Sequence, residues 1–294
     1  MDNVLLLRVT TVAATDVAMA VGVGCVLTGR WVELSSSSHS ERLRQRLAVL
    51  RIFAAVLLVV GTAGALLALV AAFSGAASLR ELRVALPDVL ATAPGRDAAA
   101  VLAVSCLVML CAVAVRGGAG SRWLLAALWL GVIGLRAASG HAVEEGPMTA
   151  AVAWQGIHLL GITAWSGAVL VSGCVLSLVT APQEARGLVA RLSRDATAGL
   201  LLVVVSGTVK TYTTLAPTHH VLPLDPWTRV LAFKLVAVAV ALVCGASSRA
   251  QLRAPVWGDA ESGRIRIYLV LESFAMLLIL VLSAWLGSTE LPGG

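Results

Sequence analysis

The sequence predicts an all-α, polytopic membrane protein with about eight transmembrane helices. Of its 294 residues, 59% are hydrophobic and only 13% are charged, a balance that is not typical of a soluble globular domain. The apolar residues gather in eight runs, and a run of roughly 20 residues is long enough to cross a bilayer. Because backbone polar groups in lipid must be satisfied within the segment itself, we expect these runs to be helices.

The eight apolar runs follow one another with short connections, so no soluble domain is expected. The first run begins close to Met1, but it has no basic stretch before it and is too long for a signal peptide, so we expect a mature helix. Between the second and third runs, SLRELRVALPDVL predicts an amphipathic segment on the membrane surface. The predicted spans are Val4–Leu27, Leu47–Phe73, Ala98–Val115, Trp123–Ala138, Thr149–Val179, Ala196–Leu215, Val230–Gly245 and Ile267–Leu286.

The basic residues are distributed unevenly between the two sets of loops. One set holds 14 of the 22, namely Arg30, Arg42, Arg44, Arg46, Arg51, Arg116, Arg122, Arg186, Arg191, Arg194, Arg249, Arg253, Arg264 and Arg266. The opposite set holds only Arg80, Arg83, Arg96, Arg136 and Arg229. By the positive-inside rule, the arginine-rich loops face the cytoplasm and both termini lie on the periplasmic side of a bacterial inner membrane. The net charge of +6 is therefore a topology signal, and it does not indicate nucleic-acid binding.

The fifth run contains the most informative stretch, QGIHLLGITAWSGAVLVSG at Gln155–Gly173. An imidazole inside a membrane segment is costly and usually marks a pathway or a site. His158 and Trp165 are seven residues apart and so share one helical face, with His158 about 14 Å below the outer surface. Small residues such as Gly161 and Gly167 predict that a second helix approaches closely. Trp165 is interpreted either as a packing residue or as part of the site.

Three more histidines lie on the predicted outer side of the membrane: His141, His219 and His220. Imidazole is a suitable ligand for copper and zinc, and Met148 offers a softer donor. A metal site formed by these residues together with His158 is one interpretation. The alternative is that the three loop histidines are ordinary polar surface residues.

Several other polar residues lie within or at the edge of the apolar runs. Lys210 and Lys234 are the only lysines of the chain, and two ammonium groups beside a cation path would repel the cation unless they are paired or deprotonated. A structural bridge from Lys234 to Asp16 or Glu272 is one interpretation. We expect Glu272 nearer the cytoplasmic end, where it suits cation exit or proton relay, and Tyr212 near the outer end.

A series of motifs resembles the copper-resistance protein D (CopD) family of bacterial inner-membrane proteins. The matching pieces are SGHA at 139–142, HLLGITAWSG at 158–167, RLSRDATAGLLLVVVSGT at 191–208, PWTRVLAFKL at 226–235 and a last helix with Glu272. The resemblance covers residues 139–285 and suggests a division into N-terminal helices (1–130) and a family-like region (131–294). It implies an eight-helix protein that handles copper and moves it from periplasm towards cytoplasm, beside a small periplasmic copper-binding protein. By position, the family pattern includes Gly140–His141, His158, Trp165, Lys234 and Glu272.

Three functions remain open at this point. The first is a copper-binding or copper-transporting protein without enzymatic activity, because the chain has no nucleotide loop, GxSxG or HExxH motif. The second is a b-type haem protein that passes electrons, with His158 and one loop histidine as axial ligands and the lysines at the propionates. The third is a scaffold or assembly protein whose membrane polar residues only bridge helices.

Overall fold

The computed structural model describes residues 3–33, 40–76, 78–115, 118–139, 149–179, 181–215, 226–253 and 257–289. Within these ranges the chain forms nine helices and no strand, which confirms the all-α prediction. The helices are α1 (Asn3–Glu33), α2 (Ser40–Ser74), α3 (Leu79–Leu90), α4 (Ala93–Ala114), α5 (Ala119–Ala137), α6 (Ala150–Leu176), α7 (Pro182–Leu215), α8 (Pro226–Gln251) and α9 (Asp259–Leu286).

Every predicted apolar run coincides with one of the long helices, and the predicted surface segment forms the short helix α3. Helix α3 begins at a Ser78 N-cap, whose hydroxyl accepts a hydrogen bond from the Glu81 amide at 3.3 Å. Of the described helices, α1, α2, α4, α6, α8 and α9 are long and apolar enough to cross a membrane. The chain is therefore a multi-pass membrane protein. Helices α5 and α7 lie where spans were predicted but are not among these six, so the count of eight is not confirmed.

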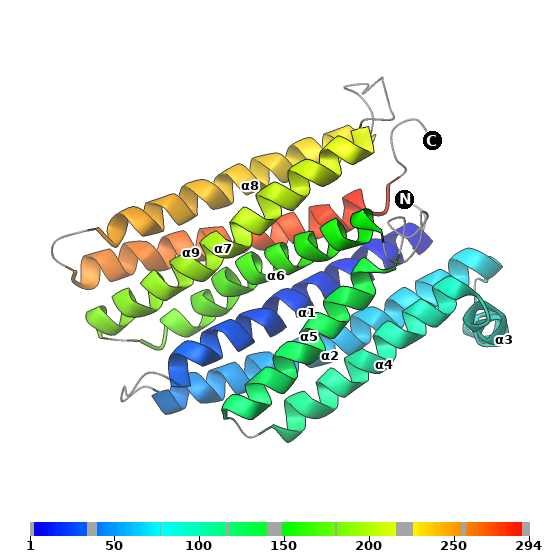
Figure 1. Ribbon diagram of the computed structural model, residues 1–294, viewed down its shortest axis with the longest axis horizontal. Coiled ribbons are helices and arrows are strands. Elements are labelled where there is room, and N and C mark those ends of the chain that lie inside the picture. Colours follow the sequence, from blue (N-terminus) through cyan, green and yellow to red (C-terminus); the bar gives the residue numbers. More distant parts are fainter. Residues whose placement is uncertain are drawn as a thin grey trace.

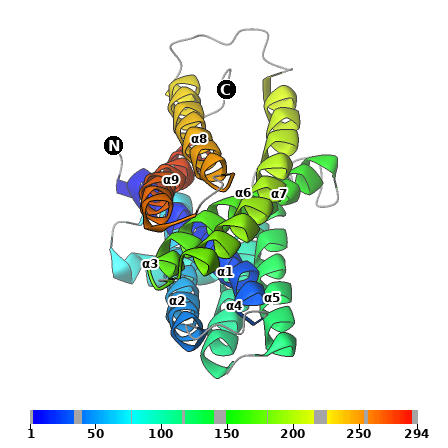
Figure 2. The same cartoon turned by 90° about the vertical axis from the view of Figure 1, so that its left-hand side faces the viewer.

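The long helices lie side by side in one bundle, with α3 and both chain ends at the same end of it (Figure 1). Helices α1 and α6 lie in the middle, between α2, α4 and α5 on one side and α7, α8 and α9 on the other (Figure 2). Sequential neighbours run antiparallel: in α6 and α7, Gly161 faces Leu202 and Trp165 faces Gly199. Helices α1 and α6 run parallel, because Gly167 faces Ala20 and Val171 faces Gly24.

Glycines set the spacing between the central helices. A Cβ atom on Gly167 would lie 2.1 Å from the Ala20 carbonyl oxygen, and one on Gly24 would lie 2.2 Å from the Gly167 carbonyl oxygen. A Cβ on Gly161 would lie 2.9 Å from the Cβ of Leu202 in α7. Only glycine fits at these positions, which confirms the prediction of close helix approach.

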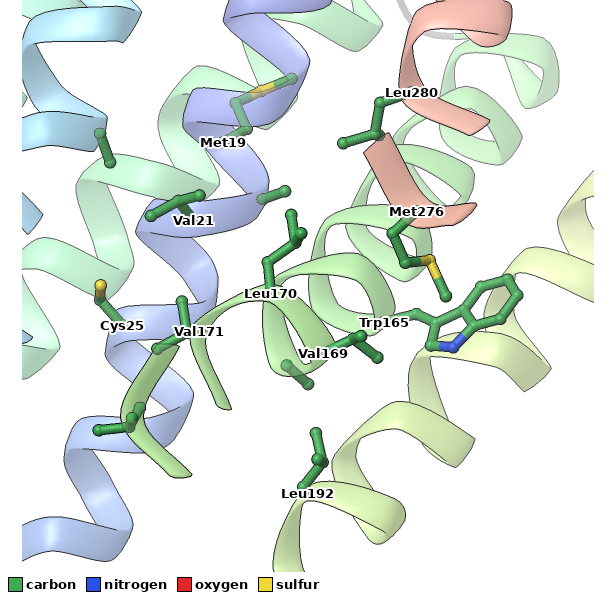
Figure 3. Packing of buried hydrophobic residues seen from close by; sticks show 14 of the residues in the cluster. Met19, Val21, Cys25, Trp165, Val169, Leu170, Val171, Leu192, Met276 and Leu280 are labelled. Carbon is green, nitrogen blue, oxygen red and sulfur yellow. The ribbon is translucent and has the colours of Figure 1, made fainter. Parts of the chain in front are cut away.

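The core runs along α6 and the helices beside it. Nearly every residue of α6 from Gly161 to Leu176 is buried, and Trp165, Val169 and Met276 belong to the largest cluster of buried apolar side chains (Figure 3). Met19 and Leu280 extend that cluster into α1 and α9. Side chains on the outer faces of α2, α8 and α9 are largely exposed and apolar, as expected for helices that face lipid.

Candidate intramembrane polar site

The α6–α7 pairing places His158 against Ser206. The His158 Nδ1 lies 3.1 Å from the Ser206 Oγ, and Ser206 is fully buried. The Ser206 hydroxyl donates its single proton to the Leu202 carbonyl oxygen at 2.5 Å, a bond back to the preceding helical turn. With that proton on the Leu202 carbonyl oxygen, the Oγ accepts from the ring, and we assign the ring proton of a neutral imidazole to Nδ1 on this basis. Nε2 then keeps its lone pair, the form in which histidine binds a metal ion.

The same helix pairing brings Lys210 to Gln155. The Lys210 ammonium donates a hydrogen bond to the Gln155 Oε1, one turn nearer the helix end than the His158–Ser206 contact. Both side chains are half-buried. The bond satisfies one of the three ammonium protons of Lys210 and ties the two helices together at their outer ends.

Helices α1, α5 and α8 add three more charged groups. Asp16 in α1 is buried and forms an ion pair with Arg136 in α5, with Oδ1 and Nη2 3.5 Å apart. The charge of Lys234 in α8 interacts with Asp16, Lys210 and His158. We call this group the polar cluster, consisting of Asp16, Arg136, Gln155, His158, Ser206, Lys210 and Lys234. It contains three cationic side chains and one carboxylate.

The Asp16–Arg136 pair corrects one sequence inference. Arg136 was counted with one set of loops although the predicted span Trp123–Ala138 contains it, and the structure places it in the last turn of α5, where it faces Asp16. Among the described residues, Lys234 forms no ion pair with Asp16 or with Glu272, the two carboxylates that the sequence suggested as its partners. Lys234 acts on Asp16 only through the electrostatic field, because Arg136 is the cation in closest contact with that carboxylate.

The remaining predicted membrane residues lie outside the polar cluster. Trp165 is 3% exposed and packs in the core, whereas Tyr212 is 74% exposed near the end of α7. Glu272 is 5% exposed and lies at the middle of α9, close to the start of the apolar run that follows the charged first turns of this helix. A Cβ on Gly245 of α8 would lie 3.1 Å from the Glu272 Oε1, which places this carboxyl group at the α8–α9 contact, away from Lys234.

Four predicted metal ligands lie outside the described residues: His141, Met148, His219 and His220. His158 is the only histidine in the part of the chain that the structure describes. Those described ranges contain no group of three or more His, Cys, Asp or Glu side chains able to hold a metal ion. They contain no pair of facing histidines for haem either. In the sequence, residues 140–148 precede α6 and residues 216–225 follow α7, so the four predicted ligands are connected to the helix ends nearest the polar cluster.

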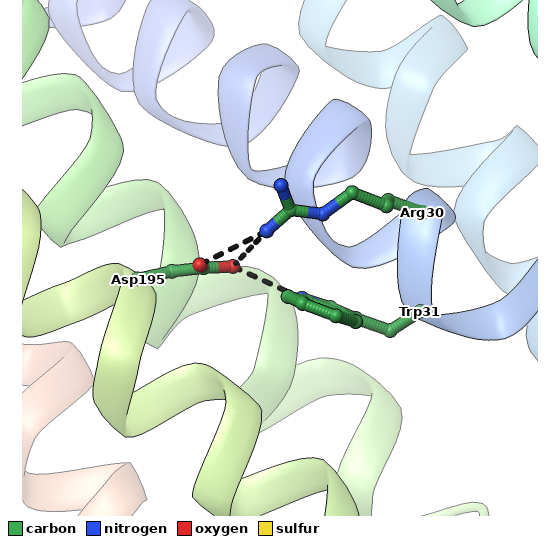
Figure 4. A network of polar contacts seen from close by, with 3 residues as sticks. All are labelled: Arg30, Trp31 and Asp195. Atoms are coloured by element: carbon green, nitrogen blue, oxygen red, sulfur yellow. Dashed lines mark hydrogen bonds and ion pairs between the residues drawn. The ribbon is translucent and has the colours of Figure 1, made fainter. Parts of the chain in front are cut away.

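A second polar contact lies at the opposite, arginine-rich end of the bundle. Asp195 in α7 accepts hydrogen bonds from Arg30 at 3.1 Å and from the Trp31 indole at 2.9 Å (Figure 4). The Arg30 and Arg191 guanidinium groups lie 4.1 and 5.3 Å from the centre of the Trp31 ring. This group fixes the end of α1 to α7 and neutralises part of the dense positive charge.

Residues 186–286 match the family model of copper resistance protein D. No curated protein and no solved structure matches the chain. The match covers about a third of the chain and confirms the resemblance that the sequence motifs indicated. The protein is thus related to copper resistance through this segment.

The matched segment supplies one wall of the polar cluster. It contains Ser206, Lys210 and Lys234, together with Glu272. His158 and Gln155 lie on α6, outside the match, and so does the HLLGITAWSG motif. The His158 imidazole therefore contacts a residue of the matched segment, Ser206, although His158 itself lies outside that segment.

Sequence reasoning missed Gln155 and Ser206 as members of the cluster and Asp195 as a helix-to-helix contact. Ser206 and Asp195 were part of the RLSRDATAGLLLVVVSGT motif, but only as pattern residues. The available signal was the antiparallel order of α6 and α7. A serine near the outer end of one helix of a pair is a natural partner for a histidine near the outer end of the other.

Proposed function

We propose that this protein is a copper-handling protein of the bacterial inner membrane that binds copper from the periplasmic side and passes it into or across the membrane without enzymatic catalysis. The observation that carries the proposal is the contact between His158 and Ser206. It joins the His158 imidazole to the segment that matches copper resistance protein D. Copper is the cargo in this proposal.

The topology that we propose has eight spans, with both termini in the periplasm. The parallel packing of α1 and α6 supports it, because two parallel spans must be separated by an odd number of spans, and α2, α4 and α5 make three if all of them cross. The arginine-rich loops then share one end of the bundle, opposite the two termini. In this orientation His158 lies about 12 Å below the periplasmic end of α6.

The copper site that we propose is completed by ligands from the loops on either side of the α6–α7 pair. His158 supplies one nitrogen, and His141, His219, His220 and Met148 are the candidate further donors. Imidazole and thioether ligands suit copper, and the hydrogen bond to Ser206 orients the His158 ring as the outer partners of metal-bound histidines usually do.

The three cations of the polar cluster weigh against free conduction of copper ions at this depth. Two unit charges 4 Å apart still interact with about 4 kcal/mol at an effective dielectric constant of 20. Such a site suits a protein that receives copper at its outer side from a periplasmic copper-binding protein and hands it on, more than it suits an open channel. The partner is inferred from the family resemblance alone.

Copper binding by purified full-length protein tests the proposal. We expect His158→Ala to remove one tightly bound copper ion per chain, measured by elemental analysis and by competition with a Cu(I) chelator. His39→Ala is the matched control, because His39 lies between the first two apolar runs, in an arginine-rich loop that we expect on the cytoplasmic side. Equal copper content in the two variants would refute the proposal. A Soret band that is present in the reduced wild type and absent from His158→Ala would show that His158 binds haem, and the haem function would then replace the copper function.

A further inference from the structure

A cavity opens at the arginine-rich end of the bundle, far from the polar cluster. It has a volume of about 600 Å³ and lies between α1, α2 and α5, below the end of α4. Two glycines explain why space remains there: a Cβ atom on Gly29 or on Gly118 would have no neighbour within 4 Å. Trp129, which packs over Gly22, closes the cavity towards the middle of the bundle.

Three arginines line this cavity: Arg44, Arg51 and Arg122. The Arg51 guanidinium is fixed by two bonds to carbonyl oxygens at the end of α4, from Nε to Ala112 at 3.1 Å and from Nη2 to Val115 at 2.8 Å. These bonds use two of its five N–H groups. Arg44 forms an ion pair with Glu41 at 2.9 Å, and no acidic side chain is among the described residues that line the cavity.

The rest of the lining is apolar. Leu47, Leu125 and Trp129 are buried side chains that face the cavity, and Val26 and Val32 continue this surface along α1. A soluble phosphate would be held by the arginines but would leave the apolar wall in contact with water. A molecule with an anionic head and a hydrocarbon tail satisfies both parts of the lining at once.

We infer that this cavity binds an anionic membrane lipid. Its phosphate would lie at the three arginines, and an acyl chain would lie against the apolar wall formed by Leu47, Leu125 and Trp129. Basic pockets between membrane helices at the cytoplasmic side are the usual place for such lipids. The volume suits a headgroup and the first part of its chains, within the range of ordinary ligand pockets. The inference depends on membrane insertion and is independent of copper.

The structure offers two matched pairs of variants. Gly29→Leu adds a side chain to the cavity lining at a position where a Cβ atom has no neighbour within 4 Å. Gly187→Leu is its control, because Gly187 is also a half-buried helical glycine whose Cβ would have no neighbour within 4 Å, and it lies outside the cavity lining. Arg44→Gln removes a lining charge. Arg46→Gln removes an exposed charge two residues further along the same helix, outside the lining.

Native mass spectrometry of the full-length protein, offered phosphatidylglycerol and phosphatidylcholine with identical chains, measures the preference. We expect a clear excess of phosphatidylglycerol adducts in the wild type, in Gly187→Leu and in Arg46→Gln. Gly29→Leu should reduce the ratio to parity, and Arg44→Gln should lower it about fivefold. Equal ratios in either matched pair, or no preference in the wild type, would overturn the inference. So would competition by glycerol 3-phosphate at equal concentration, because the apolar wall would then contribute nothing.

Discussion

Replacement of Ser206 by alanine tests how the His158 ring is prepared for copper. In the wild type, the Ser206 Oγ accepts from the His158 Nδ1 at 3.1 Å and fixes the proton on that nitrogen. Ser206→Ala removes the acceptor and leaves the helix contact otherwise intact, since only one oxygen atom is lost. The ring then either keeps an unpaired buried N–H or moves its proton to Nε2, the nitrogen that we assign to the metal.

Both outcomes weaken copper binding by a similar amount. An unpaired buried donor costs about 1–3 kcal/mol. Loss of the partner that orients a metal-bound histidine typically costs about 10–100-fold in affinity, equivalent to about 1.4–2.8 kcal/mol. We therefore expect Ser206→Ala to weaken copper binding by one to two orders of magnitude, short of the complete loss expected for His158→Ala. Ser206→Thr retains the hydroxyl and should keep most of the affinity.

Chelator competition on the purified protein measures this change, with Thr208→Ala as the control. Thr208 lies two residues further along α7, and its hydroxyl makes the same kind of bond, to the Val204 carbonyl oxygen at 2.8 Å, but it does not touch His158. Thr208→Ala should leave copper affinity unchanged. If both alanine variants bind copper as the wild type does, the ring orientation has no role and the tautomer argument is wrong.

Three further predictions concern the bundle and its charges. In denaturant titrations, Gly167→Ala should lower the free energy of unfolding by about 1–3 kcal/mol more than Gly187→Ala. Both variants gain helix propensity, but only the alanine at position 167 forces α1 away from α6. Asp16→Asn should destabilise the protein in the same assay, by less than the ~3–5 kcal/mol of a fully buried broken pair, and adding Arg136→Gln should restore part of the loss. Asp195→Ala should raise the rate of proteolysis at the arginine-rich end, whereas Asp195→Asn should have a smaller effect because it still accepts from the indole.

The helices were predictable because hydrophobic runs report the hydrocarbon part of each span. All eight runs coincide with helices to within three residues at the ends where they overrun them, yet several helices begin earlier than predicted: α7 at Pro182 and not Ala196, and α9 at Asp259 and not Ile267. The added turns are at the arginine-rich end. Charged residues there continue the helix out of the apolar region, where hydropathy no longer reports it.

The place of the candidate site along the chain was predictable, but its contacts were not. The sequence singled out His158 within its apolar run, and the structure places it in α6, whereas its depth in the membrane stays a prediction. Its partner, Ser206, is one of several small polar residues in α7, and only the pairing of the two helices selects it. The same applies to Asp16: its burial was expected, but the choice of Arg136 over Lys234 follows from how α5 packs on α1.

The match to copper resistance protein D and the His158 contact depend on each other for their functional meaning. Taken alone, the matched segment offers Ser206, Lys210, Lys234 and Glu272 among its described residues, whereas its two histidines, His219 and His220, lie outside the described residues. Taken alone, His158 is a single imidazole in an apolar helix. The register of α6 against α7 is fixed where Gly161 meets Leu202 and Trp165 meets Gly199. The same register brings His158 to Ser206 and Gln155 to Lys210. In the function that we propose, α6 and α7 act together, so variants on either helix that separate the two should weaken copper binding.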